Sequence, residues 1–217
     1  MNHSFDIRAL ELHSLYAWDY EWIMMTMDFI KAHDMNTLIL HRNDFIDLIV
    51  YPGKYFGCPD RKYDSMLERY GEIFRKLYKY TPTRRSSPYQ RYGFLKRIIE
   101  EAGRRNINIF IENKELFFPD VILEFYPHLV KNGKICANDS FWWEFTRVKY
   151  KEFFEDFPGI AGIITAPATG ESRISIKSNR CECELCKNTK KETWFSNLLY
   201  AMYEPIHAAG RKLIVRD

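Results

Sequence analysis

The sequence predicts an α/β fold in which short parallel strands alternate with helices. Three segments support this prediction: KAHDMNTLILHRND, EEAGRRNINIFIEN and HAAGRKLIVRD. Each segment starts with the last residues of a helix, which polar residues or a glycine terminate. A short apolar strand follows, and charged residues come directly after it. Such an alternation implies a parallel sheet with right-handed crossovers. Functional groups are then expected at the C-terminal ends of the strands.

Five strands can be assigned from their apolar, β-branched composition. They are expected at Ile7–Leu12, at Thr37–Leu40, at Ile107–Ile111, from Ile160 onward in IAGIITAPATGESR, and at Leu213–Val215. Five strands do not close a barrel of eight, and the chain stops at the polar end of the fifth. We therefore expect a single domain over residues 1–217, a partial TIM (β/α)8 barrel truncated at its C-terminus by about three β/α units. The alternative is a complete five-stranded doubly wound sheet, which the absence of a glycine-rich turn after the first strand disfavours.

Helices are expected between these strands from their apolar stripes and end signals. Asp19 is a candidate N-cap for a helix that runs to His33. Ser87, Pro88 and Gln90 form a capping box that starts another helix. The remaining helices are expected at Met66–Leu77, Pro119–Tyr126, Phe141–Phe157 and Thr193–Ala209, and Lys149 falls within the largely aromatic stripe of the Phe141–Phe157 helix.

The composition is that of an ordinary globular protein, and it excludes several classes. Of the 217 residues, 46% are hydrophobic and 16% aromatic, which is ample for a buried core. The 32 basic and 29 acidic residues are interspersed and leave a formal charge of +3, so no nucleic-acid-binding face is expected. No apolar run could span a bilayer and no secretion signal is recognisable, so the expected location is cytoplasmic. A half-closed barrel would expose a strand edge, which predicts self-association.

Carboxylates, bases and aromatic rings follow the strands at the edge where function is expected. They are His13, Tyr16, Trp18, His41, Arg42, Asn43, Asp44, Glu112, Asn113, Glu115, Glu171, Arg173, Arg216 and Asp217. Sugar hydrolysis needs such a set: one carboxylic acid to protonate the leaving oxygen, a second carboxylate, and aromatic faces for the sugar rings.

Specific roles can be assigned within this set. Glu171 is the candidate general acid and Glu112 the second catalytic candidate. The candidate sugar contacts are His13, Tyr16, Trp18, His41, Arg42, Asn43 and Arg173, together with the aromatic segment 51–56. The alternative, non-functional roles are that Glu171 is a surface carboxylate paired with Arg173, and that His13 and His41 are hydrogen-bonded structural residues.

A cysteine cluster follows the candidate acid on the same connection. Cys181, Cys183 and Cys186 form C-x-C-x-x-C, a spacing tight enough for three thiolates to reach one tetrahedral Zn²⁺. Cys58 and Cys136 are the candidates for the fourth ligand, because both follow strands on the same face. A sulfur-rich site would be structural rather than catalytic; free thiols or a local disulfide remain the alternatives.

With these residues placed, the chain resembles the N-terminal part of a glycoside-hydrolase-type (β/α)8 barrel, of the broad group that includes β-hexosaminidases and α-glucuronidases. The resemblance is carried by LELHSLYAWDYEWIMMTMDFIKAHDMNTLILHRNDFIDLIVYPGKYF, FWWEFTRVKYKEFFEDFPGIAGIITAPATGESR and NRCECELCKN. It implies hydrolysis of an oligosaccharide or glycoside with the acid at Glu171. Hexosaminidases carry an Asp-Glu pair at the fourth strand, whereas Gly170 precedes Glu171 here, so substrate-assisted chemistry is not implied.

Two other functions remain compatible with the sequence. The partner carboxylate of such enzymes comes from a later strand, so this stretch alone is expected to be inactive. The first alternative is therefore a non-catalytic sugar-binding or interaction module that is stabilised by a structural zinc site. The second is a phosphate-binding doubly wound domain, which the lack of a phosphate-cradling glycine loop disfavours.

Overall fold

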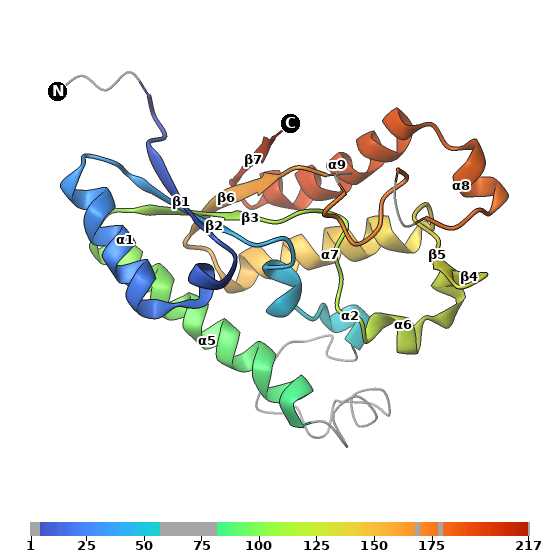
Figure 1. The fold of residues 1–217 in the computed structure, drawn as a ribbon, viewed down its shortest axis with the longest axis horizontal. Helices are drawn as coiled ribbons and strands as arrows, with labels where there is room; N and C mark the ends of the chain where they lie inside the picture. The colour runs from blue at the N-terminus through green and yellow to red at the C-terminus, as the bar shows by residue number, and fades with distance from the viewer. Residues whose placement is uncertain (1–4, 57–81, 168–169, 178–179, 217) are drawn as a thin grey trace.

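A computed structural model describes residues 5–56, 82–167, 170–177 and 180–216. Its main sheet has five parallel strands in the order β1-β2-β3-β6-β7 (Figure 1). They are β1 (Ala9–His13), β2 (Thr37–His41), β3 (Asn108–Glu112), β6 (Ile160–Thr165) and β7 (Lys212–Val215). The strands follow one another in chain order, without the reversal that a doubly wound sheet has. The expected five-stranded partial TIM-barrel-like fold is therefore confirmed.

Four long helices connect these strands and share one core with them. They are α1 (Tyr20–Ala32), α5 (Pro82–Arg104), α7 (Phe141–Asp156) and α9 (Lys191–Ala208). Residues from all four helices join Leu38, Leu40, Ile109 and Ile111 of the strands in one large buried cluster. In Figure 1, α1, α5 and α7 run below the strands. Alternate strand residues point to opposite faces, so the helices cover the face that carries these leucines and isoleucines.

The opposite face of the sheet is different in character. Ile39, Phe110 and Ile164 form a small separate buried cluster there, with Ala161 and Ile214 packed against it. In a (β/α) barrel this face is the interior, filled by side chains from alternate strand positions. The next residues on this face along β2, β3 and β7 are His41, Glu112 and Arg216, and they begin the candidate site.

The connections that follow the strands are long and carry short elements of their own. They contain η1 (Ser14–Trp18), η2 (Ile46–Leu48), α2 (Gly53–Phe56), α6 (Ile122–Phe125), η4 (Pro127–Leu129), β4 (Val130–Lys131), β5 (Lys134–Ile135) and α8 (Glu184–Asn188). Strands β4 and β5 form an antiparallel hairpin, and its turn has positive φ at both Asn132 and Gly133. That pair of angles is typical of a tight hairpin turn, where asparagine and glycine are favoured.

Most of the expected helix ends agree with the structure, but the starts of two helices differ: α6 begins at Ile122 rather than at Pro119, and α5 begins earlier than expected. The Asp19 carboxylate caps α1 by accepting a hydrogen bond of 3.0 Å from the backbone N–H of Trp22. Helix α5 begins at Pro82, before the capping box expected at Ser87, and continues through Pro88. Proline fixes φ near its helical value and removes one backbone hydrogen bond. The buried residues Leu95, Ile98 and Ala102 stabilise the helix beyond it.

The expected helix over residues 66–77 and the ligand candidate Cys58 lie outside the described residues. Among the described residues, no helix is both long enough and apolar enough to cross a membrane.

Candidate functional site

A group of ionisable side chains lies at the C-terminal ends of the parallel strands, on the face away from the helices. We call it the strand-end cluster, and it consists of Glu11, His13, His41, Glu112, Lys114, Glu171 and Arg216. The strand register explains how it forms, because His13 pairs with His41 across β1 and β2, and His41 pairs with Glu112 across β2 and β3. Register partners point to the same face of a sheet, so these three side chains are neighbours.

Glu11 is at the centre of the first half of the cluster. Its Oε1 lies 2.5 Å from His41 Nδ1 and 2.7 Å from His13 Nε2, and its Oε2 lies 2.7 Å from the Arg216 guanidinium. Burial raises the pKa of Glu11, but the hydrogen bonds to Arg216 and His41 and their charges outweigh it, so the pKa lies below its usual value. Glu11 is therefore an ionised hydrogen-bond acceptor at neutral pH.

Glu112 occupies the second half and is fully buried. Its Oε2 accepts a hydrogen bond of 2.6 Å from Arg216, while its Oε1 lies 3.0 Å from Lys114 Nζ and 3.4 Å from His41 Nε2. Arg216 and His41 thus each bridge Glu11 and Glu112. The two carboxylates are held in a fixed arrangement by two side chains that offer hydrogen-bond donors.

Glu171 lies at the open side of the cluster. Its side chain is 59% exposed, and its Oε2 lies 3.5 Å from Lys114 Nζ, which also contacts Glu112. The alternative pairing of Glu171 with Arg173 is not the one seen. The structure therefore brings Glu171 and Glu112 to the same lysine, with Glu171 as the carboxylate that solvent or a ligand can reach.

The other candidate sugar contacts after β2 lie beside the cluster. Arg42 forms an ion pair of 2.6 Å with Asp44, and the backbone oxygen of Asn43 accepts a hydrogen bond from the backbone N–H of Lys114. Arg173 instead pairs with Asp120 and lies over the ring of Phe118. Asp217 lies outside the described residues.

The aromatic candidates divide between surface and core. Tyr16 is exposed and its ring lies 4.9 Å from that of Trp22. Trp18 is partly buried and stacks on Phe45, with the ring centroids 4.5 Å apart. In the segment 51–56, Tyr55 and Phe56 are buried, so that part packs in the core rather than lining an open mouth. Tyr55 shows the physical reason, because it contacts rings of the β3–α7 connection and of α7.

A second ionic network, fully inside the protein, lies under these connections. The Lys149 ammonium lies 2.9 Å from Asp47 and 2.8 Å from Glu115, and the Tyr150 hydroxyl donates a hydrogen bond of 2.6 Å to Glu115. Asn113 also donates to Glu115. The lysine and both carboxylates are buried. The set holds two carboxylates for one cation, so it is electrostatically unbalanced when both are ionised.

The pKa shifts in this network follow from that imbalance. Burial, together with the negative charge of the neighbouring Glu115, raises the pKa of Asp47 to about 6 despite the attraction of Lys149. Burial lowers the pKa of Lys149, but the two carboxylates more than compensate and leave it above its usual value. One oxygen of Asp47, Oδ2, has no hydrogen-bond partner among the described residues. Asp47 and Arg173 both line a pocket of about 330 Å³.

Sequence reasoning missed two members of the strand-end cluster, Glu11 and Lys114. Glu11 lies inside a strand, between Leu10 and Leu12, whereas the site was expected only among residues that follow the strands. The sequence nevertheless contained a signal for Glu11, because side chains two residues apart in a strand point to the same face, which places Glu11 beside His13. Lys114 had no comparable signal, because it lies in a connection whose path the sequence does not specify.

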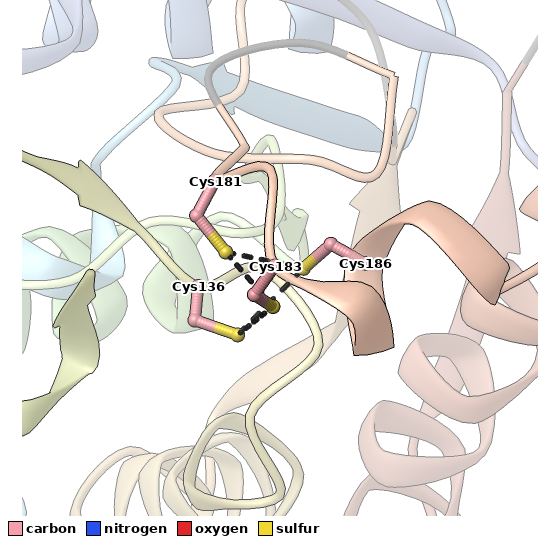
Figure 2. A group of neighbouring side chains, drawn as sticks. All are labelled: Cys136, Cys181, Cys183 and Cys186. Atoms are coloured by element: carbon pink, nitrogen blue, oxygen red, sulfur yellow. Dashed lines mark hydrogen bonds between the residues drawn. The ribbon is translucent and has the colours of Figure 1, made fainter. Parts of the chain in front are cut away.

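Four cysteine sulfurs form a further group, away from the strand ends (Figure 2). They belong to Cys136 in the β3–α7 connection and to Cys181, Cys183 and Cys186 in the β6–α9 connection. Neighbouring sulfurs lie 3.2 to 3.7 Å apart, and all four lie within 4.8 Å of one another. The expected thiol cluster therefore exists, with Cys136 as its fourth member, and it could hold a metal ion.

Neither a family model nor a curated protein matches this sequence. Solved structures do match its fold. An exo-β-N-acetylglucosaminidase from Vibrio harveyi, solved with N-acetylglucosamine, has a TM-score of 0.58 at 15% identity and aligns with 98% of this chain. A GH138 enzyme targeting pectin rhamnogalacturonan II has a TM-score of 0.53 at 14% identity and aligns with 97%. A hypothetical protein from Ruminiclostridium thermocellum ATCC 27405 has a TM-score of 0.53 at 14% identity and aligns with 95%.

The matches differ in how much of the other chain is covered. This chain spans 35% of the Vibrio harveyi enzyme and 29% of the GH138 enzyme, but 96% of the Ruminiclostridium thermocellum protein. At these identities the likeness concerns the fold. The expected resemblance is confirmed at that level: the chain has the fold of part of a glycoside-hydrolase-type barrel.

Proposed function

We propose that this chain is a carbohydrate-active, glycoside-hydrolase-like domain that binds a sugar at the strand-end cluster. The observation that carries the proposal is the position of three carboxylates, Glu11, Glu112 and Glu171, among basic side chains at the C-terminal ends of parallel strands. Active sites of (β/α) barrel enzymes form at that edge. The neighbouring folds belong to enzymes that act on glycans, which supports a carbohydrate as the ligand.

Each part of the cluster has a role in this proposal. Glu171 is the exposed carboxylate and serves as the general acid that protonates the leaving oxygen of a glycosidic bond. Glu112 and Glu11 supply carboxylate oxygens that accept hydrogen bonds from sugar hydroxyls. Arg216 and His41, which bridge them, offer the complementary donors. Tyr16, exposed just after β1, provides an aromatic face for a sugar ring.

A second candidate function is sugar binding without turnover. It is favoured by one observation: each of the three carboxylates is already paired with a cation. A catalytic acid must carry a proton, and a nearby ammonium group favours the ionised form instead. In this case the same cluster would hold the glycan, and no residue of it would transfer a proton.

The test compares the native gene product that contains these 217 residues with its Glu171→Gln variant. Aryl glycosides report hydrolysis, and a glycan panel reports binding. We expect kcat/KM to fall by about 100-fold or more in Glu171→Gln while binding is retained, because general acid catalysis typically contributes that much. The matched control is Glu155→Gln on α7, an exposed glutamate outside the cluster, which should change neither readout.

The outcomes separate the two candidates. Unchanged turnover in Glu171→Gln contradicts the assignment of the acid. Binding by the native protein without any turnover favours the second candidate. Failure of the native protein both to bind and to hydrolyse every glycan tested contradicts the proposed function itself.

A further inference from the structure

The four sulfurs described above have the arrangement of a closed metal site. Four thiolates held at about 2.3 Å from one tetrahedral ion lie roughly 3.8 Å from one another. The distances from Cys136 to Cys183 and Cys186 are 3.7 and 3.6 Å, and those from Cys181 to Cys186 and Cys183 are 3.5 and 3.2 Å. Figure 2 shows the four side chains converging on one point from two connections. These four distances are 0.1 to 0.6 Å shorter than about 3.8 Å, so a small outward shift of the sulfurs along these edges would bring them to the ideal separation.

The surroundings of the sulfurs fix their positions independently of any ion. The backbone N–H of Cys181 donates to the oxygen of Ile135, next to Cys136. The indole N–H of Trp142 donates to the oxygen of Cys136. Three of the four cysteines are buried, and Cys183 is partly exposed. The donor set is therefore preorganised and largely closed to solvent, which is typical of structural rather than catalytic metal sites.

The local charge also suits an anionic centre. Four thiolates and one Zn²⁺ carry a net charge of −2. The charge of Lys131 interacts with Cys136, and the Arg180 guanidinium donates a hydrogen bond of 3.0 Å to the backbone oxygen of Cys186. Cations beside the sulfurs stabilise the thiolate forms that bind metal.

We propose that Cys136, Cys181, Cys183 and Cys186 bind one Zn²⁺ as a structural centre that joins the β3–α7 and β6–α9 connections. Binding replaces the four thiol protons with the metal ion and releases them to solvent, with no change of oxidation state. The sulfur-only, tetrahedral donor set selects zinc or iron among biological metals, and zinc needs no redox partner.

The centre has a consequence for the strand ends, because the two connections that it joins also meet near the strand-end cluster. The Ser172 hydroxyl donates a hydrogen bond of 2.5 Å to the backbone oxygen of Glu115, and Arg173 pairs with Asp120. Glu171 lies next to these contacts on the same connection as three of the ligands. Zinc therefore holds in place the segment that carries Glu171, whether or not that segment catalyses a reaction.

The test measures metal content and thermal stability in the native gene product. We expect one zinc per chain by elemental analysis and its loss in Cys186→Ser. The matched control is Cys58→Ser, which should keep the zinc because four ligands are already present. Removing zinc from the native protein with a thiol-binding mercurial should release one equivalent and lower the thermal midpoint by roughly 10 °C or more.

A variant that fails to fold does not decide the matter, so a second readout uses the native sequence. Cobalt exchanged into the site should show the strong visible absorption of tetrahedral Co²⁺ bound by thiolates. A folded native protein that contains no metal and in which these four thiols all react overturns the proposal. So does iron in place of zinc, or loss of the metal in Cys58→Ser.

Discussion

Replacing Lys149 with methionine is expected to lower the free energy of unfolding by about 3–5 kcal/mol at pH 8, because it leaves two buried carboxylates without their cation. Lys149 is fully buried and contacts both Asp47 and Glu115 at hydrogen-bond distance. Methionine matches the length of the aliphatic stem, so the packing loss is small and the change is mainly electrostatic. Denaturant unfolding of the native and variant proteins gives the difference directly.

The pH dependence of this loss distinguishes an electrostatic cause from a packing defect. Without Lys149, the folded-state pKa of Asp47 rises further above its unfolded value. A carboxyl group with a raised folded-state pKa stabilises the fold below its unfolded pKa, and this contribution is lost as pH rises through the folded pKa. Asp47 already has a pKa of about 6 in the native protein. The deficit of the variant should therefore be smaller at pH 5 than at pH 8.

The control for this experiment lies two residues away on the same helix. Lys151 has a side chain that is 71% exposed, and Lys151→Met should change stability by less than about 0.5 kcal/mol. The double variant Asp47→Asn with Lys149→Met should recover part of the loss, because it removes one of the two uncompensated charges. Equal effects of Lys149→Met and Lys151→Met, or a deficit that does not change with pH, would contradict the assigned network.

Replacing Gly162 with alanine is expected to lower the free energy of unfolding by about 3 kcal/mol, through overpacking. A Cβ at this position would lie 2.6 Å from Phe110 Cε1 and would also clash with the backbone oxygen of Lys212 in β7. That backbone belongs to the neighbouring strand and can move only by disturbing the sheet. The register between β3 and β6 also shifts beside this glycine, where Ile109 pairs with Ile160 but Phe110 pairs with Gly162.

A second glycine provides the matched control for this substitution. Gly103 lies in α5, and a Cβ there would meet nothing within 4 Å. Gly103→Ala should be neutral or stabilising by up to about 1 kcal/mol, because alanine has the higher helix propensity. Thermal unfolding of the two variants side by side checks the prediction, and a Gly162→Ala protein as stable as the native one would contradict the strand contact.

The parts of the fold that the sequence predicted are those set by local pattern. Apolar strands such as Thr37–Leu40 and the Asp19 cap are encoded by residues that are close together in the chain. The start of α5 was wrong because the signals at Ser87 and Pro88 are compatible with a helix that has already begun. Local sequence signals indicate which backbone conformations a residue can adopt, and tertiary packing determines which of these conformations forms.

The candidate site was predicted less completely, because it depends on contacts between distant residues. Arg216 and Glu11 are separated by nearly the whole chain, yet their side chains form an ion pair. The sequence likewise did not indicate the partners of Lys149, Asp47 and Glu115, because they lie in two different connections. Cys136 could be proposed as a ligand, but only the path of the β3–α7 connection brings it to the other three cysteines.

The most direct test of the central claim is a titration of the isotopically labelled protein with monosaccharides, including N-acetylglucosamine, followed by backbone amide chemical shifts. A sugar that binds at the strand-end cluster should shift the amides of residues 41–43, 112–114 and 171–173 together, with one common dissociation constant. The same titration of Glu155→Gln should be unchanged. Saturable shifts confined to another surface, or no saturable shift with any sugar, would contradict the claim that this cluster is a carbohydrate site.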